Sequence, residues 1–233
     1  MQKLKVVIYN IRHGAGMDLE VNLERIAEVL RGLDPDLVLL QEVDNKCGRS
    51  GKVDQMARLG ELTGMHHAFG PFFEHDGGLY GLGALGKVPV VEVEEHGWAP
   101  EQGSRFFFAV RLETEEWYGK ILFVDVHLYV DIEDRREQAN RLVRMFAGEK
   151  RPMLVGGDFN SMPGSEIMEL VGAHWTVSAK EGSPLTFPAD EPGRELDFFV
   201  YRPAEEIDVV NSWVVDEQMA SDHRPVVVEL APR

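Results

Sequence analysis

The chain has 233 residues, 44% of them hydrophobic, and a formal net charge of −16. This length and apolar content suit one large α/β domain, so we expect a single domain over residues 1–233. No apolar run approaches the roughly 20 residues of a membrane-spanning helix. Residues 1–10 show no apolar export signal, so a cytoplasmic location is expected.

The negative charge and the lone cysteine narrow the classes of function. DNA-binding proteins usually present a basic surface, because contacts to phosphates supply most of their affinity, so long duplex DNA is not an expected partner. The arginines of residues 134–144 lie among acids and are interpreted as a solvated helix face. Cys47 is the only cysteine, which excludes an intrachain disulfide and favours a reducing compartment. It lies in a polar loop without a partner, which argues against a catalytic nucleophile.

Strands and helices alternate along the chain, by their hydrophobic periodicity and their Gly and Pro signals. The first half is predicted to contain a strand over 4–10, a helix over 18–33, a strand over 36–44, a helix over 53–63 and short β-rich runs over 66–112. The second half is predicted to contain a strand over 120–128, a helix over 132–147, and strands over 151–160, 195–201 and 224–230. Two strand–helix–strand blocks of similar length result, one in each half.

Each of these blocks carries polar residues where its strands end. In α/β folds ligands collect at the carboxyl ends of strands, because the loops there are held by the sheet. Two such blocks side by side would bring five residues to one edge: Asn10, Glu42, His127, Asp158 and Asn160. In the segment LVGGDFNSMPG (154–164), the strand would position the Asp and the Asn at its end, and Gly156 and Gly157 would leave room beside them.

Each of these side chains also has a simpler interpretation when taken alone. An exposed strand end, an Asx turn, a buried core histidine or a turn cap would explain one residue at a time. The same holds for three polar residues late in the chain, Asp197, Asp222 and His223. Their joint occurrence next to core strands favours one shared site.

Eight short segments together carry a family resemblance. In chain order they are YNIRHG (9–14), LLQEVD (39–44), GGLYG (77–81), VHL (126–128), RREQ (135–138), GGDFNSMPGS (156–165), ELDFFV (195–200) and SDHRPV (221–226). Their kind and order resemble the endonuclease/exonuclease/phosphatase, or DNase I-like, superfamily, and the first segment looks most like its bacterial general-purpose members. The resemblance implies a four-layer α/β sandwich, with two mixed sheets packed face to face and helices on the outside.

The resemblance also implies a divalent cation. Glu42 would be its main ligand, with Asn10 nearby and Asp222 on the metal side. Carboxylate and amide oxygens suit Mg²⁺, and Mn²⁺ would fit the same oxygen set.

The catalytic roles follow from the same resemblance. Asp158 would orient or deprotonate the attacking water, and Asn160 and His127 would donate hydrogen bonds to phosphate oxygens. His223, held by Asp197, would contact the phosphate or transfer a proton. No covalent intermediate is needed in this scheme.

The chain departs from the family pattern at a few positions. Many relatives read Gly-Asn-Ala followed by Leu-Ser in the central β region, where this chain has Leu82 in place of the Asn and Gly86 in place of the Ser. Arg12 replaces an acid that repair-type relatives carry, and could bind a substrate phosphate. Val126 replaces the usual Thr before the His-Leu pair.

The expected function is therefore Mg²⁺-dependent hydrolysis of a small phosphodiester, a nucleotide or a phospholipid headgroup. One alternative is a nuclease that acts on single-stranded or damaged nucleic acid. Another is a non-catalytic binding module of the same fold, against which the full set of polar residues argues. The sequence leaves the oligomeric state open.

Overall fold

The structure, a computed structural model, describes residues 3–98 and 105–233. Twelve strands form its centre: β1 Leu4–Asn10, β2 Leu37–Asn45, β3 His66–His75, β4 Gly78–Gly86, β5 Val90–Trp98, β6 Arg105–Leu112, β7 Leu122–His127, β8 Met153–Asp158, β9 Thr176–Val177, β10 Asp197–Arg202, β11 Ile207–Val214 and β12 Val226–Pro232. The described α-helices are α1 Leu23–Leu33, α2 Gln55–Thr63, α3 Ile132–Phe146 and α4 Glu166–Gly172.

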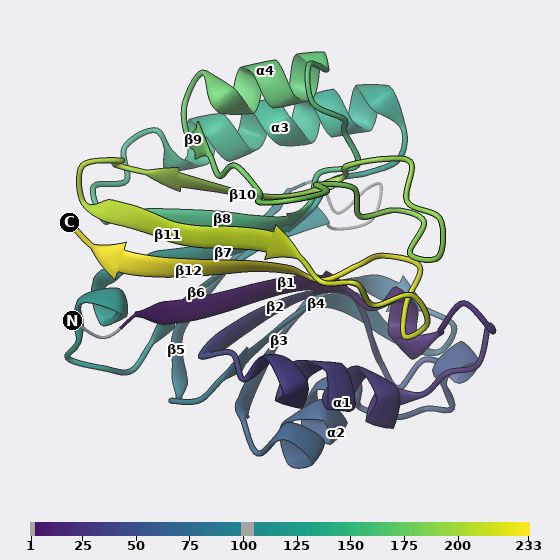
Figure 1. Cartoon of the computed structure of the whole chain (residues 1–233). Coiled ribbons are helices and arrows are strands. Elements are labelled where there is room, and N and C mark those ends of the chain that lie inside the picture. Colours follow the sequence, from purple (N-terminus) through teal and green to yellow (C-terminus); the bar gives the residue numbers. More distant parts are fainter. Residues whose placement is uncertain (1–2, 99–104) are drawn as a thin grey trace.

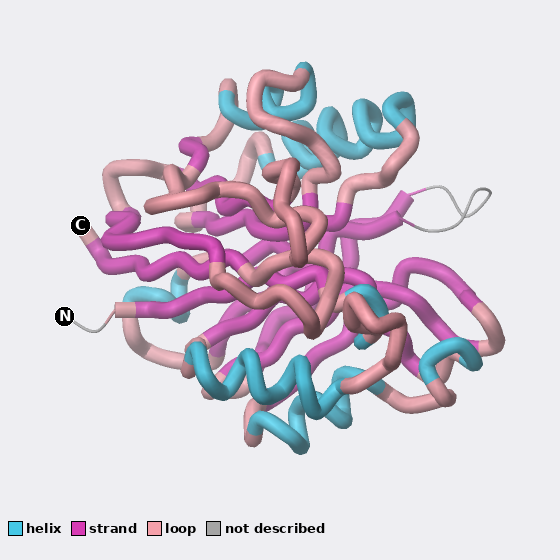
Figure 2. Tube along the Cα trace, turned by 45° about the vertical axis from the view of Figure 1, so that its right-hand side comes forward, coloured by secondary structure: helices cyan, strands magenta, loops and turns pink. Residues whose placement is uncertain are grey.

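The strands form two six-stranded sheets that face each other, as Figure 1 shows. One sheet has the order β11-β12-β1-β2-β4-β3, and the other has the order β5-β6-β7-β8-β10-β9. Helices α1 and α2 cover the outer face of the first sheet, and α3 and α4 cover that of the second (Figures 1 and 2). The predicted four-layer α/β sandwich is confirmed.

Three apolar cores separate these layers. The middle core lies between the sheets and contains side chains such as Ile8, Leu39 and Phe123. The two outer cores lie between each sheet and its helix pair, with Ile26 of α1 in one and Leu142 of α3 in the other. The strands at the centre of each sheet are buried on both faces, which explains their nearly continuous apolar sequences.

The two predicted strand–helix–strand blocks are present. In the first, β1 and β2 are parallel neighbours joined through α1. In the second, β7 and β8 are parallel neighbours joined through α3. The carboxyl ends of all four strands therefore lie at one edge of the sandwich, away from the adjacent termini seen in Figure 1.

The first predicted helix is wrong in its N-terminal bound. The helix begins at Leu23 rather than at residue 18, because Asn22 caps it by accepting a hydrogen bond from the Arg25 amide at 3.0 Å. Leu19, which had completed the apolar pattern, has a left-handed φ of +67° and is 70% exposed. It belongs to the loop that precedes the helix.

The other predicted elements are confirmed with bounds that differ by a few residues. Strands β3 to β6 account for the β-rich region, of which residues 99–104 lie outside the described residues. Elements α4, β9 and β11 were not predicted from the sequence. Within the described ranges, no helix is both long enough and apolar enough to cross a membrane.

Candidate active site

Strand register brings the predicted side chains together at one edge of the sandwich. Asn10 is opposite Gln41 in the β1–β2 pair, and His127 is opposite Asp158 in the β7–β8 pair. Strand β10 is antiparallel to β8, so that its first residue, Asp197, pairs with the last residue of β8, Asp158. Side chains from both halves of the chain therefore share one site.

The segment before β12 reaches the same edge, because β12 runs antiparallel to β1. The Ser221 hydroxyl donates a hydrogen bond to the Asn10 carbonyl at 2.7 Å. This bond ties the Ser221-Asp222-His223 segment to the end of β1, and places Asp222 and His223 in the site.

Glu42 projects into the site from a bulge in β2. The pairing of β2 with β4 shifts its register between Leu40 and Val43, and Glu42 has a left-handed φ of +59°. Such a backbone costs a non-glycine residue roughly 1–3 kcal/mol, and strain of this kind clusters at functional sites. The Asn10 amide nitrogen donates to the Glu42 carboxylate at 3.2 Å. With 26% of its side chain exposed, Glu42 remains open to a ligand.

Asp158 is the buried hub of the site. One of its carboxylate oxygens, Oδ1, accepts a hydrogen bond from the backbone N–H of Asn160 at 2.7 Å. The other, Oδ2, accepts a hydrogen bond from the side-chain Nδ2 of Asn10 at 3.2 Å. Oδ2 also lies 3.5 Å from Nε2 of His127 and 3.7 Å from Nε2 of His223. Burial raises the pKa of Asp158, and the neighbouring histidines act in the opposite direction.

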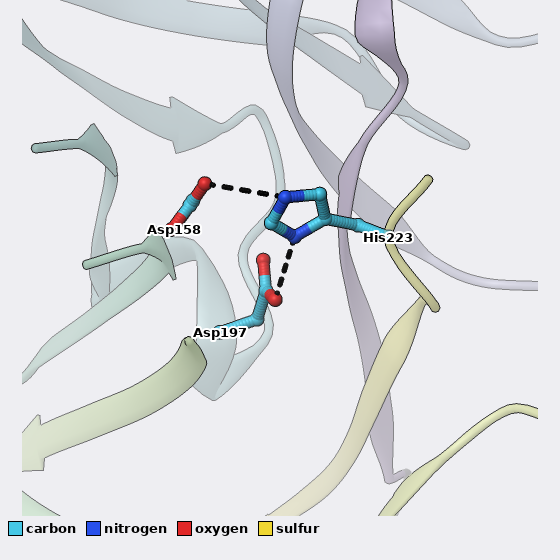
Figure 3. Close-up of side chains that lie close together, drawn as sticks. All are labelled: Asp158, Asp197 and His223. Atoms are coloured by element: carbon cyan, nitrogen blue, oxygen red, sulfur yellow. Dashed lines mark hydrogen bonds and ion pairs between the residues drawn. The ribbon is translucent and has the colours of Figure 1, made fainter. Parts of the chain in front are cut away.

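His223 lies between two carboxylates, as Figure 3 shows. Its Nδ1 is 2.9 Å from Oδ2 of Asp197, and its Nε2 faces Asp158. Burial acts to lower the pKa of His223, but the charges of Asp197 and Asp158 outweigh it and raise the pKa to about 10. The imidazole is therefore protonated at neutral pH in this arrangement.

His127 is oriented by Tyr80, which was not predicted from the sequence as a site residue. The Tyr80 hydroxyl lies 3.3 Å from His127 Nδ1, which leaves Nε2 to face Asp158 and Glu42 at 3.5 and 3.9 Å. Tyr80 belongs to the GGLYG segment, so the family resemblance marked its position without its role.

Asn160 holds the loop that follows Asp158. Its φ is +47°, and its side-chain Nδ2 donates a hydrogen bond to the Leu128 carbonyl at 2.8 Å. The guanidinium of Arg135 on α3 donates to the Asn160 carbonyl. Arg135 is therefore a site-supporting residue that the interpretation of residues 134–144 as a solvated face missed.

The remaining arginines of that helix fit the interpretation. Arg136 pairs with Glu133 and Glu166 at 2.5 and 2.7 Å, and Arg141 pairs with Glu137 at 2.6 Å. These exposed ion pairs form no basic groove.

Arg12 lies beside Asp222. Its Nε is 3.4 Å from Asp222 Oδ2, and 31% of its side chain is exposed. Burial raises the pKa of Asp222, and the Arg12 charge acts to lower it. A partly exposed cation at this position can face a phosphate as well as the carboxylate.

Gly156 and Gly157 serve packing rather than ligand access. A Cβ on Gly157 would lie 2.0 Å from the carbonyl oxygen of Val126 on β7. A Cβ on Gly156 would lie 2.7 Å from side-chain atoms of Ile8 and Phe199 in the middle core. The expectation that they leave room beside Asp158 and Asn160 is therefore replaced by close strand and sheet contact.

Two of the family departures lie in the interior. Leu82 is fully buried in the core between the sheets, and Gly86 is approached so closely by the Val88 carbonyl that a Cβ would lie 2.6 Å from it. Neither lines the pocket at the site.

Cys47 is also buried, and burial raises the pKa of its thiol to about 11, which agrees with the argument against a nucleophile.

Six of the predicted side chains line a pocket of about 470 Å³: Glu42, His127, Asp158, Asn160, Asp222 and His223. Further polar residues of its lining are Arg49, His75, Gln138 and Arg194. Aromatic residues line much of the rest: Phe72, Phe73, Tyr80, Tyr129 and Phe187. A pocket of this size is suited to a small molecule.

The site offers two ways to hold a cation. Ligand atoms of Asp158, Asp197 and His223 all lie within 4.8 Å of one another. The 2.9 Å contact between His223 and Asp197 is a hydrogen-bond distance, however, so that His223 Nδ1 is engaged. Glu42 and Asp222 present only oxygen atoms and are 26% and 23% exposed, a combination that fits Mg²⁺ better.

Asn10 makes a different contact from the one expected of a metal ligand. Its nitrogen faces Glu42 and Asp158, while its oxygen accepts a hydrogen bond from the Arg12 amide at 3.1 Å. In this arrangement Asn10 holds the two carboxylates in place. Rotation of the amide would be needed for its oxygen to face a cation beside Glu42.

Comparison with known proteins shows the family of the chain. A model described as "Endonuclease/Exonuclease/phosphatase family" matches residues 7–223. By sequence, none of the curated proteins compared matches the chain.

Solved structures share the fold. An endonuclease/exonuclease/phosphatase from Beutenbergia cavernae is 24% identical with a TM-score of 0.79, over 100% of this chain and 72% of that one. A functionally unknown conserved protein from Enterococcus faecalis is 21% identical with a TM-score of 0.80, over 99% of this chain and 100% of that one. A mannosyl-6-phosphatase from Bacteroides thetaiotaomicron is 18% identical with a TM-score of 0.75, over 98% of this chain and 99% of that one.

Proposed function

Because the chain belongs to the endonuclease/exonuclease/phosphatase family and is a hydrolase, we propose that it cleaves a small phosphoester with the help of bound Mg²⁺, which Mn²⁺ could replace. The observation that carries the proposal is the approach of Asn10, His127 and His223 to one carboxylate, that of Asp158, beside Glu42 in a pocket. These groups can bind a phosphate, activate water and stabilise developing charge.

Glu42 and Asp222 would hold the cation, with Asn10 positioning Glu42. The carboxylates of Glu42, Asp222 and Asp158 line the same pocket, where a divalent cation would balance part of their charge. Burial and the Glu42 charge act to raise the pKa of Asp222, and the charges of His223 and Arg12 act to lower it. A bound divalent cation would polarise the phosphorus–oxygen group and stabilise the leaving oxygen.

Asp158 would accept the proton of the attacking water. A general base must lie within hydrogen-bond reach of that water and be held in place, and the bonds from Asn160 and Asn10 fix both oxygens of Asp158. His223, charged and held by Asp197, would donate a hydrogen bond or a proton to a phosphate oxygen.

His127 and Asn160 would bind the phosphate oxygens as charge develops on them. His127 Nε2 already faces the carboxylates of the site. Arg12, beside Asp222, would contact a phosphate oxygen from the metal side.

Pocket size and charge favour a small substrate over a long polyanion. The pocket has a volume of about 470 Å³, and the chain has a net charge of −16. A mannosyl-6-phosphatase from Bacteroides thetaiotaomicron has the same fold, so the fold can serve a small phosphoester. At 18% identity that neighbour supports no particular substrate for this chain.

Hydrolysis of bis-p-nitrophenyl phosphate tests the proposal. We expect release of p-nitrophenolate with Mg²⁺ or Mn²⁺, none with EDTA, and recovery when the metal is added back. Asp158→Asn, purified in the same way, controls for a contaminating phosphatase. Hydrolysis that survives EDTA and this substitution would contradict the proposal.

A further inference from the structure

Aromatic side chains line the pocket on two sides of Asp158, one beside His127 and the other beside His223. On the His127 side, the ring of Tyr80 lies 5.1 Å from that of Phe73, with an angle of 30° between the rings. The guanidinium of Arg49 lies 5.5 Å from the Tyr80 ring centre. A bidentate pair with the buried Asp44, at 2.8 and 2.9 Å, fixes this arginine. This side of the pocket is therefore a rigid stack of flat groups.

The His223 side repeats this arrangement. The Phe187 ring lies 4.8 Å from the His223 ring, and the Arg194 guanidinium lies 4.5 Å from the Phe187 ring centre. Both Phe187 and Arg194 line the pocket. Flat π-systems and guanidinium planes thus stand on either side of the place where a phosphate would bind.

The mouth of the pocket continues as an exposed apolar lip. Tyr129 and Val130 line the pocket yet are 45% and 74% exposed. They follow β7, the strand that ends in His127. Apolar side chains exposed at the edge of a pocket can contact a ligand that binds there.

We propose that the organic group of the substrate is a planar aromatic heterocycle, as in a single nucleotide, and that it stacks on the aromatic pocket wall and the Tyr129–Val130 lip. This inference rests on the proposed phosphoester hydrolysis and names its substrate class. A nucleobase has a π-face that aromatic rings and arginine planes recognise without base-specific hydrogen bonds. The volume of about 470 Å³ suits one nucleotide unit rather than a polymer.

Two other organic groups fit the same surface less well. A sugar or inositol phosphate would need polar partners for each of its hydroxyl groups, whereas the two walls present aromatic rings and the guanidinium planes of Arg49 and Arg194. A phospholipid in an anionic membrane would be repelled by the charge of −16. Ribose 5-phosphate and phosphocholine therefore serve as the competing ligands in the test.

Titration calorimetry with matched ligands provides the test. Adenosine 5′-monophosphate and ribose 5-phosphate differ at C1 of the ribose, which carries adenine in the first and a hydroxyl group in the second. The Asp158→Asn variant with Mg²⁺ slows turnover during the titration. We expect the nucleotide to bind about 5- to 150-fold more tightly than ribose 5-phosphate, the range for stacking of one base. Equal affinities, or tighter binding of phosphocholine, would overturn the inference.

A second set of variants tests the surface itself. Tyr129→Ala with Val130→Ser, in the same Asp158→Asn background, should lower the affinity for the nucleotide by about 5-fold or more and leave that for ribose 5-phosphate unchanged. Val210→Ser, which alters an apolar side chain 40% exposed on β11, is the matched control and should change neither. An unchanged affinity ratio in the Tyr129 and Val130 variant would refute the role of the lip. Metal-dependent hydrolysis of bis-p-nitrophenyl phosphate by the wild type, measured in parallel, shows separately whether the proposed function holds.

Discussion

His223 and Asp197 join the two sheets of the sandwich through a contact of 2.9 Å between Nδ1 and Oδ2. His223 precedes β12 of one sheet, and Asp197 begins β10 of the other. Since Nδ1 donates its proton to Asp197, Nε2 is left to face Asp158 and a bound phosphate. The relative placement of the two sheets therefore sets the orientation of a proposed catalytic imidazole.

Asp197→Asn should weaken turnover while the fold survives, because the variant keeps the size of the side chain but loses the charge that stabilises the imidazolium. Burial alone would lower the pKa of His223, so its present value of about 10 should fall once one carboxylate is neutral. NMR titration of the His223 ring checks this directly. We expect kcat to fall roughly 10²-fold or more, and an unchanged ring pKa would rule out the proposed coupling.

Asp158 and His223 should act as one unit on the same phosphorus. Asp158→Asn and His223→Ala should each lower kcat by about 10²–10⁴-fold, with a much smaller change in KM, because proton transfer and charge stabilisation develop in the transition state. The double variant should be far less than multiplicatively worse. Circular dichroism and melting are the controls for folding. A folded single variant with wild-type kcat would refute the proposed site.

Glu42 should be the centre of metal binding. Glu42→Gln keeps the shape of the side chain and removes one charge, so the affinity for Mg²⁺ in titration calorimetry should fall at least tenfold while the melting temperature changes little. Glu61→Gln, at a position whose side chain is 71% exposed on α2, is the matched control and should bind Mg²⁺ as the wild type does. Equal Mg²⁺ affinity in both variants would move the cation to another part of the site.

Long duplex DNA should bind poorly. The net charge of −16 repels phosphates, and Arg136 and Arg141 of α3 are paired to glutamates, so contact with DNA should release few counterions. Fluorescence anisotropy with a random duplex of about 30 base pairs should show no tight binding and little dependence on salt. Tight and steeply salt-dependent binding would instead support the nuclease alternative.

The sequence predicts this fold well because both strand–helix–strand blocks are locally encoded. Continuous apolar strands and an amphipathic helix between them leave few alternatives, and the polar residues at the strand ends converge once the strands run parallel. The helix over 18–33 is wrong at its start because the exposed Leu19 imitates the apolar period. Helix α4 has seven residues and β9 has two, which is too short for a periodic signal to stand out. The register of β11 shifts between Val209 and Asn211, which interrupts its alternation.

The supporting contacts of the site could not be predicted in the same way. Tyr80 reaches His127 across the gap between the sheets, and Arg135 reaches the Asn160 carbonyl from α3. Both contacts depend on how distant elements pack, which no local pattern records. The glycines of β8 show the same limit, since their role becomes visible only when Val126 and Ile8 are seen next to them.

Gln41 and Asp125 form a buried polar link between the sheets, and Gln41 immediately precedes Glu42 in the chain. Gln41 Nε2 donates to Asp125 Oδ1 at 2.6 Å, while Oε1 of Gln41 and Oδ2 of Asp125 have no hydrogen-bond partner among the described residues. Burial raises the pKa of Asp125 well above its usual 3.8. A protonated Asp125 would supply the donor that the Gln41 oxygen lacks.

The pH dependence of stability tests this protonation. A carboxyl group whose pKa is raised by folding stabilises the folded state fully below its unfolded pKa of about 3.9, and that contribution is lost as pH rises through the folded pKa. Asp125→Asn is neutral at every pH and keeps both an acceptor and a donor for Gln41. In urea denaturation at pH 5, 7 and 9, the variant should therefore gain stability relative to the wild type as pH rises, by about 1–3 kcal/mol at pH 9. Asp125→Ala, which leaves Gln41 without a partner, should be less stable than Asp125→Asn at each pH. Parallel pH profiles of the wild type and Asp125→Asn would show that Asp125 carries the same proton in the folded and unfolded chains, and would end the assignment of a neutral carboxyl to this link.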